Sequence, residues 1–120
     1  MLNIPIDSMQ RYILTAQTRK QQRLANLGQR RALGCQVARA AAQLLKAEFG
    51  ASRVVVFGSL LNDRFHEGSD IDLAVWELPE KTYFKAVSRL LSLSDFAVDL
   101  VEIQYARPEL LSAIAQGLSL

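Results

Sequence analysis

Hydrophobic and polar positions follow two different periods along the chain, and the change occurs near residue 50. Between residues 7 and 49 there is no proline, and apolar residues recur every three or four positions, as in AQLLKAEFG. This spacing predicts a helical region that ends with Gly50 as its C-cap. Gly28 and Gly34 alone interrupt the helix-rich composition, so a split of the helix, if there is one, is expected at one of them.

After residue 50 the apolar residues form shorter runs. The run RVVVF (53–57) is almost entirely β-branched, which indicates a strand buried on both faces. Two further strands are predicted in SDIDLAVWE (69–77) and FAVDLVEI (96–103). Helical spacing predicts one helix within residues 80–94 and a closing helix in RPELLSAIAQG (107–117).

This order of elements corresponds to an α/β (α+β) fold, in which a small mixed sheet of three or four strands is flanked by helices. Half of the 120 residues are hydrophobic, an ordinary globular composition. A chain of this length is large enough for one core, so residues 1–120 are expected to form a single domain. Residues 1–50 would be its helical N-terminal extension and residues 51–120 its core.

Charge is divided unevenly between these two parts. Residues 1–50 contain eight Lys and Arg against two acidic residues (+6), and residues 51–120 contain six against ten (−4), which restores the formal net charge of +2. A basic N-terminal half could contact nucleic acid or an acidic protein. A solvated helix face is the more frequent explanation, and direct nucleic-acid binding is not expected.

The sequence predicts neither a membrane protein nor a secreted one. Charged residues interrupt every apolar run before it reaches the roughly 20 residues of a transmembrane helix. The stretch MLNIPIDSMQRY lacks the basic region and apolar core of a signal peptide. Cys35 is the only cysteine, which fits a reducing compartment, so we expect a cytoplasmic protein.

Two aspartates lie on alternate positions of a predicted strand, where carboxylates are rare. Side-chain alternation directs Asp70 and Asp72 to one face, about 7 Å apart along the strand. Their mutual repulsion and loss of hydration would be relieved by a divalent cation such as Mg²⁺. If the second and third strands are neighbours, Asp99 joins them, and three carboxylates could hold two metal ions about 3.5–4 Å apart.

The first predicted strand ends in a Gly-Ser pair. Gly58 would let an anion approach the backbone closely, and Ser59 offers a hydroxyl donor beside exposed N–H groups of the turn. A phosphate could therefore lie beside the aspartates. Other nucleotide and metal motifs are excluded by spacing, because the chain has no P-loop, no GxGxxG fingerprint and no EF-hand loop.

The order of FGS, ten residues, DID in an apolar strand and a lone Asp in a later strand resembles the polymerase-β-type nucleotidyltransferase superfamily. Within it, the small size, the stretch SDIDLAV and the helical N-terminal arm are similar to minimal nucleotidyltransferase (MNT) domains. These domains are often the antitoxin half of HEPN–MNT toxin–antitoxin pairs.

The resemblance implies a role for each matching residue. Gly58 and Ser59 would bind the triphosphate, and Asp70, Asp72 and Asp99 would be the catalytic residues that bind Mg²⁺. The implied reaction is transfer of AMP from ATP to a hydroxyl, such as a tyrosine of a cognate HEPN ribonuclease toxin, with loss of pyrophosphate. The chain would then be a protein adenylyltransferase that forms a hetero-oligomer with its toxin.

The sequence departs from the family pattern directly after Gly-Ser. Many relatives continue with a small residue, Arg and Gly, whereas GSLLNDRF has Asn62 and Asp63 where that Arg and Gly often fall. Arg64, further along, is the candidate for contacting the phosphates instead. Two alternatives stay open: a non-catalytic antitoxin that neutralises its toxin by binding alone, and a nucleotidyltransferase that acts on a small molecule.

Overall fold

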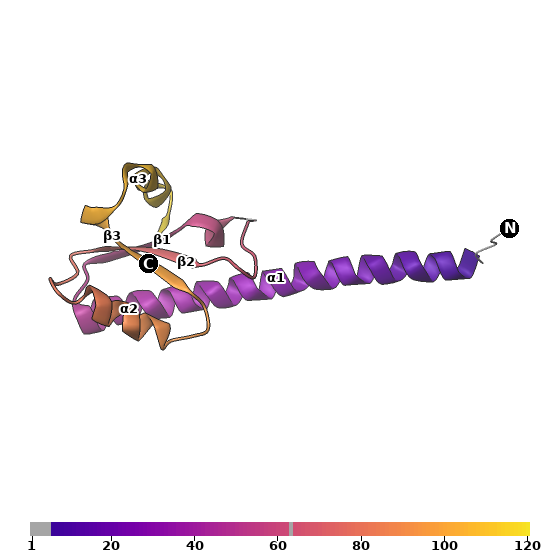
Figure 1. Cartoon of the computed structure of the whole chain (residues 1–120), viewed down its shortest axis with the longest axis horizontal. Helices are drawn as coiled ribbons and strands as arrows, with labels where there is room; N and C mark the ends of the chain where they lie inside the picture. Colours follow the sequence, from indigo (N-terminus) through magenta and orange to yellow (C-terminus); the bar gives the residue numbers. More distant parts are fainter. Residues whose placement is uncertain (1–5, 63) are drawn as a thin grey trace.

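The computed structural model of the chain describes residues 6–62 and 64–120, so Asp63 lies outside the described residues. The elements follow in the order α1 (Ile6–Phe49), β1 (Arg53–Phe57), η1 (Gly58–Leu61), β2 (Ile71–Trp76), α2 (Tyr83–Leu91), β3 (Val98–Glu102), η2 (Ile103–Tyr105), α3 (Pro108–Ala115) and β4 (Leu118–Ser119). The strands form one mixed sheet in the order β3–β2–β1–β4, with α1 and α2 on one face and α3 on the other (Figure 1). This architecture confirms the predicted fold class.

The helix α1 is a single uninterrupted element of 44 residues, so the split considered at Gly28 or Gly34 does not occur. A Cβ at Gly28 would meet nothing within 4 Å, but one at Gly34 would lie 2.8 Å from Cδ1 of Leu60 and 3.4 Å from Cζ of Phe65. Gly34 therefore permits close packing of the helix on the segment after β1. The helix ends as predicted, because Gly50 has a left-handed φ of +71°.

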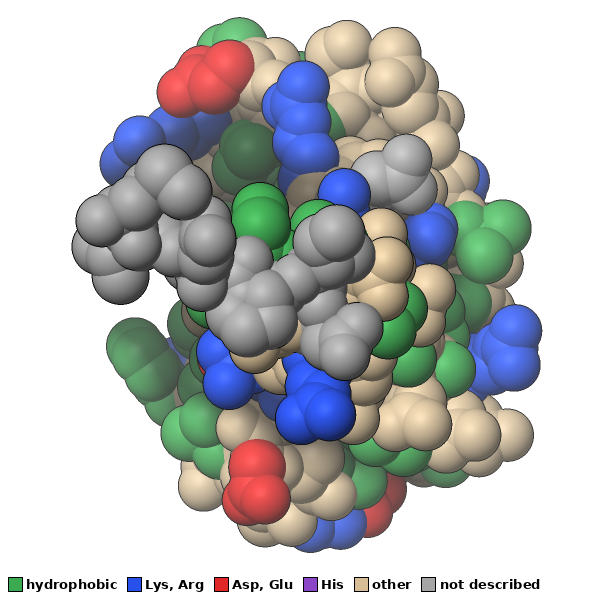
Figure 2. Space-filling view, turned by 90° about the vertical axis from the view of Figure 1, so that its right-hand side faces the viewer, with side chains coloured by type: hydrophobic (Ala, Val, Ile, Leu, Met, Phe, Trp, Pro, Cys, Tyr) green, Lys and Arg blue, Asp and Glu red, His purple; other side chains and the backbone are tan. Residues whose placement is uncertain are grey.

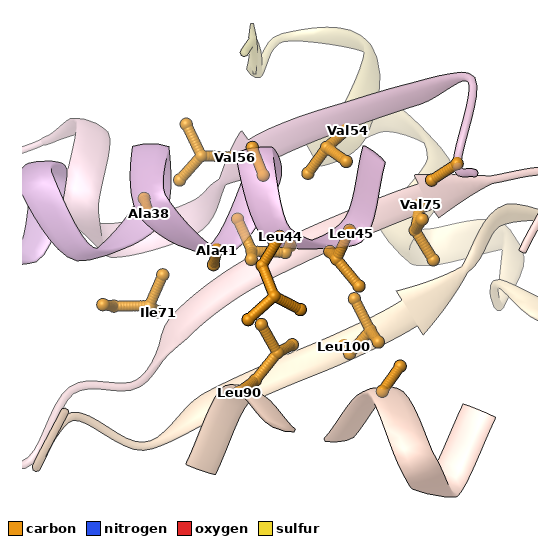
Figure 3. Packing of buried hydrophobic residues seen from close by; sticks show 14 of the residues in the cluster. Ala38, Ala41, Leu44, Leu45, Val54, Val56, Ile71, Val75, Leu90 and Leu100 are labelled. Carbon is orange, nitrogen blue, oxygen red and sulfur yellow. The ribbon is translucent and has the colours of Figure 1, made fainter. Parts of the chain in front are cut away.

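Only the last part of α1 packs against the sheet. Ala38, Ala41, Leu44 and Leu45 face Val54 of β1 and its neighbours in the larger core cluster (Figure 3). From Ser8 to Gln29 every residue is exposed except the half-buried Leu27. This part of the helix projects away from the sheet and gives the molecule extents of 74 × 29 × 20 Å (Figure 1).

The central strand β1 is buried on both faces, as its β-branched run predicts. Val54 and Val56 belong to the core cluster on the α1 side, whereas Val55 and Phe57 belong to the cluster on the α3 side. All four side chains are at most 3% exposed. Alternation along the strand thus divides one apolar run between two core layers.

The other strands confirm the expected neighbours and add one short edge strand. β2 runs antiparallel to β1 and parallel to β3, so the second and third predicted strands are adjacent. β4 pairs antiparallel with β1 through two residues only, too few for a period to be recognised in the sequence. None of the helices in the described part of the chain is long and apolar enough to cross a membrane.

Candidate active site

Three of the predicted site residues meet where β1 ends and β2 and β3 begin. Asp72 of β2 is paired with Phe57, the last residue of β1, on one side and with Asp99 of β3 on the other. Residues paired in a parallel register direct their side chains to the same sheet face, so both carboxylates lie on the face that α3 partly covers. Asp70 precedes β2 by one residue and has the same parity as Asp72.

The backbone of Gly58 lies directly against Asp72. Gly58 has a left-handed φ of +81°, and a Cβ there would overlap Oδ2 of Asp72 and lie 3.3 Å from its Cγ. No larger residue fits this position without displacing the carboxylate. Ser59 follows in the first turn of η1 and is partly exposed, next to the strand end that carries the carboxylate.

The electrostatic environment of Asp72 is unfavourable for a negative charge. Desolvation by burial, followed by the charges of Asp99 and Asp70, raises the pKa of Asp72 from 3.8 to about 6. The two neighbouring carboxylates are therefore close enough to act on Asp72 through space. A partly buried carboxylate with such a shift, packed against a glycine backbone, has the properties expected of a functional site.

The donor chemistry of this site fits Mg²⁺. Carboxylate oxygens are the ligands that Mg²⁺ uses in proteins, and one or two carboxylates commonly suffice when phosphate oxygens and water complete its coordination. Asp72 and Asp99 supply such a pair on adjacent strands. Within residues 6–62 and 64–120, however, no three Asp, Glu, His or Cys side chains gather into a group that could hold a metal ion. The site for two ions with three carboxylates stays a prediction.

The segment after Ser59 is stabilised by Asn62. The Asn62 N–H donates to the Ser59 carbonyl (3.1 Å), and Oδ1 of Asn62 accepts from the Arg64 N–H (2.8 Å). The Arg64 side chain is exposed and makes no hydrogen bond or ion pair with the described residues, so no contact brings it to the carboxylates. Its role in phosphate binding stays a prediction, and Asp63 lies outside the described residues.

A cavity of about 390 Å³ opens beside Asp99, along β3 and the segment leading to α3. Its walls include Tyr83, whose hydroxyl donates to the Leu100 carbonyl at 2.7 Å, and Arg107, which precedes α3. The sequence patterns did not single out Arg107, because it stands at the start of the predicted closing helix and belongs to no recognisable motif. The fold alone brings it to this cavity.

Comparison with known proteins identifies the family of the chain. Residues 40–120 match the family described as polymerase beta, nucleotidyltransferase, and the chain therefore belongs to this family. A solved structure provisionally described as a minimal nucleotidyltransferase is 30% identical to the chain. That match covers 79% of this chain and 92% of the other, with a TM-score of 0.48. No curated protein matches the chain significantly.

The family match confirms the predicted nucleotidyltransferase domain and the general class of transferase. It includes every predicted site residue, from Gly58 to Asp99. It also begins inside α1, at residue 40, so the projecting part of the helix lies outside the matched region.

Proposed function

We propose that this protein is a minimal nucleotidyltransferase that transfers AMP from Mg-ATP to a tyrosine hydroxyl of a cognate HEPN ribonuclease toxin, and so neutralises it. The observation that supports the chemistry best is the pairing of Asp72 with Asp99, with the Gly58 backbone against the Asp72 carboxylate. The family match supports the reaction class. The identity of the acceptor and the identity of the nucleotide are both part of the proposal.

In this proposal Asp70, Asp72 and Asp99 would hold Mg²⁺, which neutralises charge on the triphosphate and the departing pyrophosphate when it is bound. The backbone at Gly58 and the hydroxyl of Ser59 bind phosphate oxygens. Asp99 accepts the proton of the acceptor hydroxyl as the oxygen–phosphorus bond forms at the α-phosphate. The bond from the α-phosphate to its bridging oxygen breaks, and pyrophosphate leaves.

The cavity beside Asp99 is the place where we expect the acceptor side chain. It lies at the open edge of the sheet, since β3 is an edge strand. A volume of about 390 Å³ is at the lower end of the range for small-molecule sites and accommodates one aromatic side chain. A protein acceptor that brings its own docking surface suits such a limited pocket.

The direct test is the intact mass of the toxin after incubation with this protein, ATP and Mg²⁺. The toxin is sought as an all-helical protein with an Arg-x-x-x-x-x-His motif, encoded in a neighbouring reading frame. We expect a gain of one or more AMP units with the wild type and with Glu80→Gln, an exposed residue in the turn after β2. Asp72→Asn should reduce transfer at least about 100-fold. An unchanged toxin mass, with nucleotide binding verified, contradicts the proposal.

A second candidate is a non-catalytic antitoxin that covers its toxin. One observation favours it: a long basic part of α1 is exposed. An assay of growth distinguishes the two functions, because it measures whether the protein protects cells that produce the toxin. Protection retained by Asp72→Asn supports neutralisation by binding, whereas lost protection with intact toxin binding supports catalysis.

A further inference from the structure

The part of α1 that precedes Gly34, residues 8–33, is mostly exposed and strongly basic, with Leu27, Arg30 and Arg31 half-buried. We call this segment the arm. It contains six basic residues and no acidic one: Arg11, Arg19, Lys20, Arg23, Arg30 and Arg31. The view along α1 from its N-terminal end shows more Lys and Arg than Asp and Glu side chains on this side of the molecule (Figure 2).

The charges of the arm are concentrated on one side of the helix. At 100° per residue, all six basic positions fall within roughly 200° of arc. The same arc contains Ala38, Ala41 and Leu45, which α1 buries against the sheet. The opposite side of the arm contains neutral residues such as Gln17 and Gln21. The basic side is therefore a direct continuation of the core-packing face.

Apolar side chains lie among these charges. Met9, Tyr12 and Ile13 are 52%, 77% and 51% exposed and share the arc of the basic residues. A nucleic acid would pair its phosphates with the cations and stack a base on Tyr12, but it offers no apolar surface for the aliphatic Met9 and Ile13. A protein surface that offers both acidic and apolar groups matches the whole face.

A large groove marks the point where the arm joins the sheet. It has a volume of about 1120 Å³ and is lined by Arg23, Leu27 and Arg30 of the arm and by Phe96 before β3, among others. The Arg30 guanidinium stacks on the Phe96 ring at 4.5 Å, and its Nη2 donates to the Glu67 carbonyl at 3.1 Å. Its Nε is buried and has no hydrogen-bond partner within the described residues.

A second copy of the chain is a poor occupant of this face. Pairing two arms in parallel would place Lys20 against Lys20, and antiparallel pairing would bring Lys20 and Arg23 of both copies together at the centre. Like charges in contact destabilise such a pair. Charge complementarity instead requires an acidic partner.

We propose that the arm and the groove at its base form a docking surface for a partner protein with an acidic surface that also exposes apolar side chains. Its identification as the toxin that accepts the nucleotide rests on the proposed function. The arm would hold the acceptor protein while the cavity beside Asp99 receives one of its side chains. The long helix thus supplies the acceptor recognition that the small domain lacks.

Two matched double variants test the docking surface. Arg19→Gln/Arg23→Gln and Gln17→Glu/Gln21→Glu both lower the net charge by two, on opposite sides of the helix. With the toxin as probe, calorimetry should show at least about tenfold weaker binding for the first variant and less than about twofold change for the second. A second pair of variants with one substitution each, Ile13→Ser and Leu14→Ser, tests in the same way how much the apolar side chains contribute to toxin binding.

Hydrogen exchange of the wild-type complex supplies an independent readout. We expect slower amide exchange in residues 8–33 when the toxin is added. Equal effects of the two double variants, protection confined to other elements, or no binding of the toxin would each overturn the proposal. Transfer to the toxin that is equally efficient with Arg19→Gln/Arg23→Gln would overturn docking but not the nucleotidyltransferase function. Toxin binding to the arm without transfer would preserve docking and contradict catalysis.

Discussion

The arm (residues 8–33) and the following body of the protein (34–62 and 64–120) contain two parts of the same helix in opposite environments. Ala41 and Leu45 are fully buried, whereas Met9 and Ile13, on the same side of α1, are about half exposed. The arm has no sheet to cover it, so it lacks the tertiary packing from which most helices in proteins gain their stability. An apolar stripe therefore predicts a contact face, but only the surrounding chain decides whether that contact is internal.

The largest expected effect contrasts one leucine in each part. Leu45→Ala removes a fully buried side chain and should lower the free energy of unfolding by about 2–5 kcal/mol. Leu24→Ala removes a side chain of the arm that is 61% exposed. This substitution should change the free energy of unfolding by less than about 0.5 kcal/mol. Urea unfolding followed by circular dichroism measures both. Similar losses for the two variants would mean that the free protein already covers its arm.

The next effect concerns the carboxylate of Asp72 in the body of the protein, and it depends on pH. Asp72 has a raised pKa of about 6, so the folded protein binds its proton more tightly than the unfolded chain does. The ionised carboxylate therefore destabilises the fold fully above pH 6, and this penalty disappears as pH falls towards about 4. Asp72→Asn should raise stability by about 1–3 kcal/mol at pH 8 and have little effect at pH 4.

Thermal unfolding in EDTA at both pH values measures this difference. Glu80→Gln is the control, since it removes an exposed carboxylate from the opposite end of β2. If Asp72→Asn gives the same stabilisation at pH 4 as at pH 8, ionisation of Asp72 is not the cause. Added Mg²⁺ should reduce the difference at pH 8, because a cation relieves the repulsion in the wild type.

A smaller effect contrasts the two glycines of α1. Gly28→Ala should stabilise the protein by about 0.5–1 kcal/mol, because the position is open and alanine favours the helix. Gly34→Ala should destabilise it by about 1 kcal/mol, because the new methyl group must displace the buried Leu60. Opposite signs in the same unfolding assay are the expected result. Stabilisation by both substitutions would show that the packing at Gly34 is loose.

The smallest effect is expected for the ion pair between α1 and α2. Arg89 donates to both carboxylate oxygens of Glu48, at 2.9 and 2.6 Å, but both residues are exposed. Exposed ion pairs contribute little because water and salt screen them. Glu48→Gln should therefore leave the thermal midpoint nearly unchanged in 0.5 M NaCl. A large drop under these conditions would show that the pair holds α2 in place.

The candidate site was partly accessible from the sequence. The spacing of Gly58-Ser59, Asp70, Asp72 and Asp99 is local information, because each lies at the end or start of a recognisable strand. The pairing of Asp72 with Asp99 depended on which strands are neighbours, which periodicity does not contain. Arg107 and the cavity beside Asp99 were inaccessible for the same reason.

By itself, the sequence determined the three α-helices and three of the four strands, the end of α1 at Gly50 and the strand buried on both faces, because these follow from local periods and backbone preferences. The tertiary structure alone decided that Gly34 packs against Leu60 without ending a helix, and that a two-residue strand closes the sheet. It also decided that one continuous stripe of α1 is buried at Leu45 and exposed at Ile13. Burial depends on what the rest of the chain places opposite a residue, and no local pattern records that.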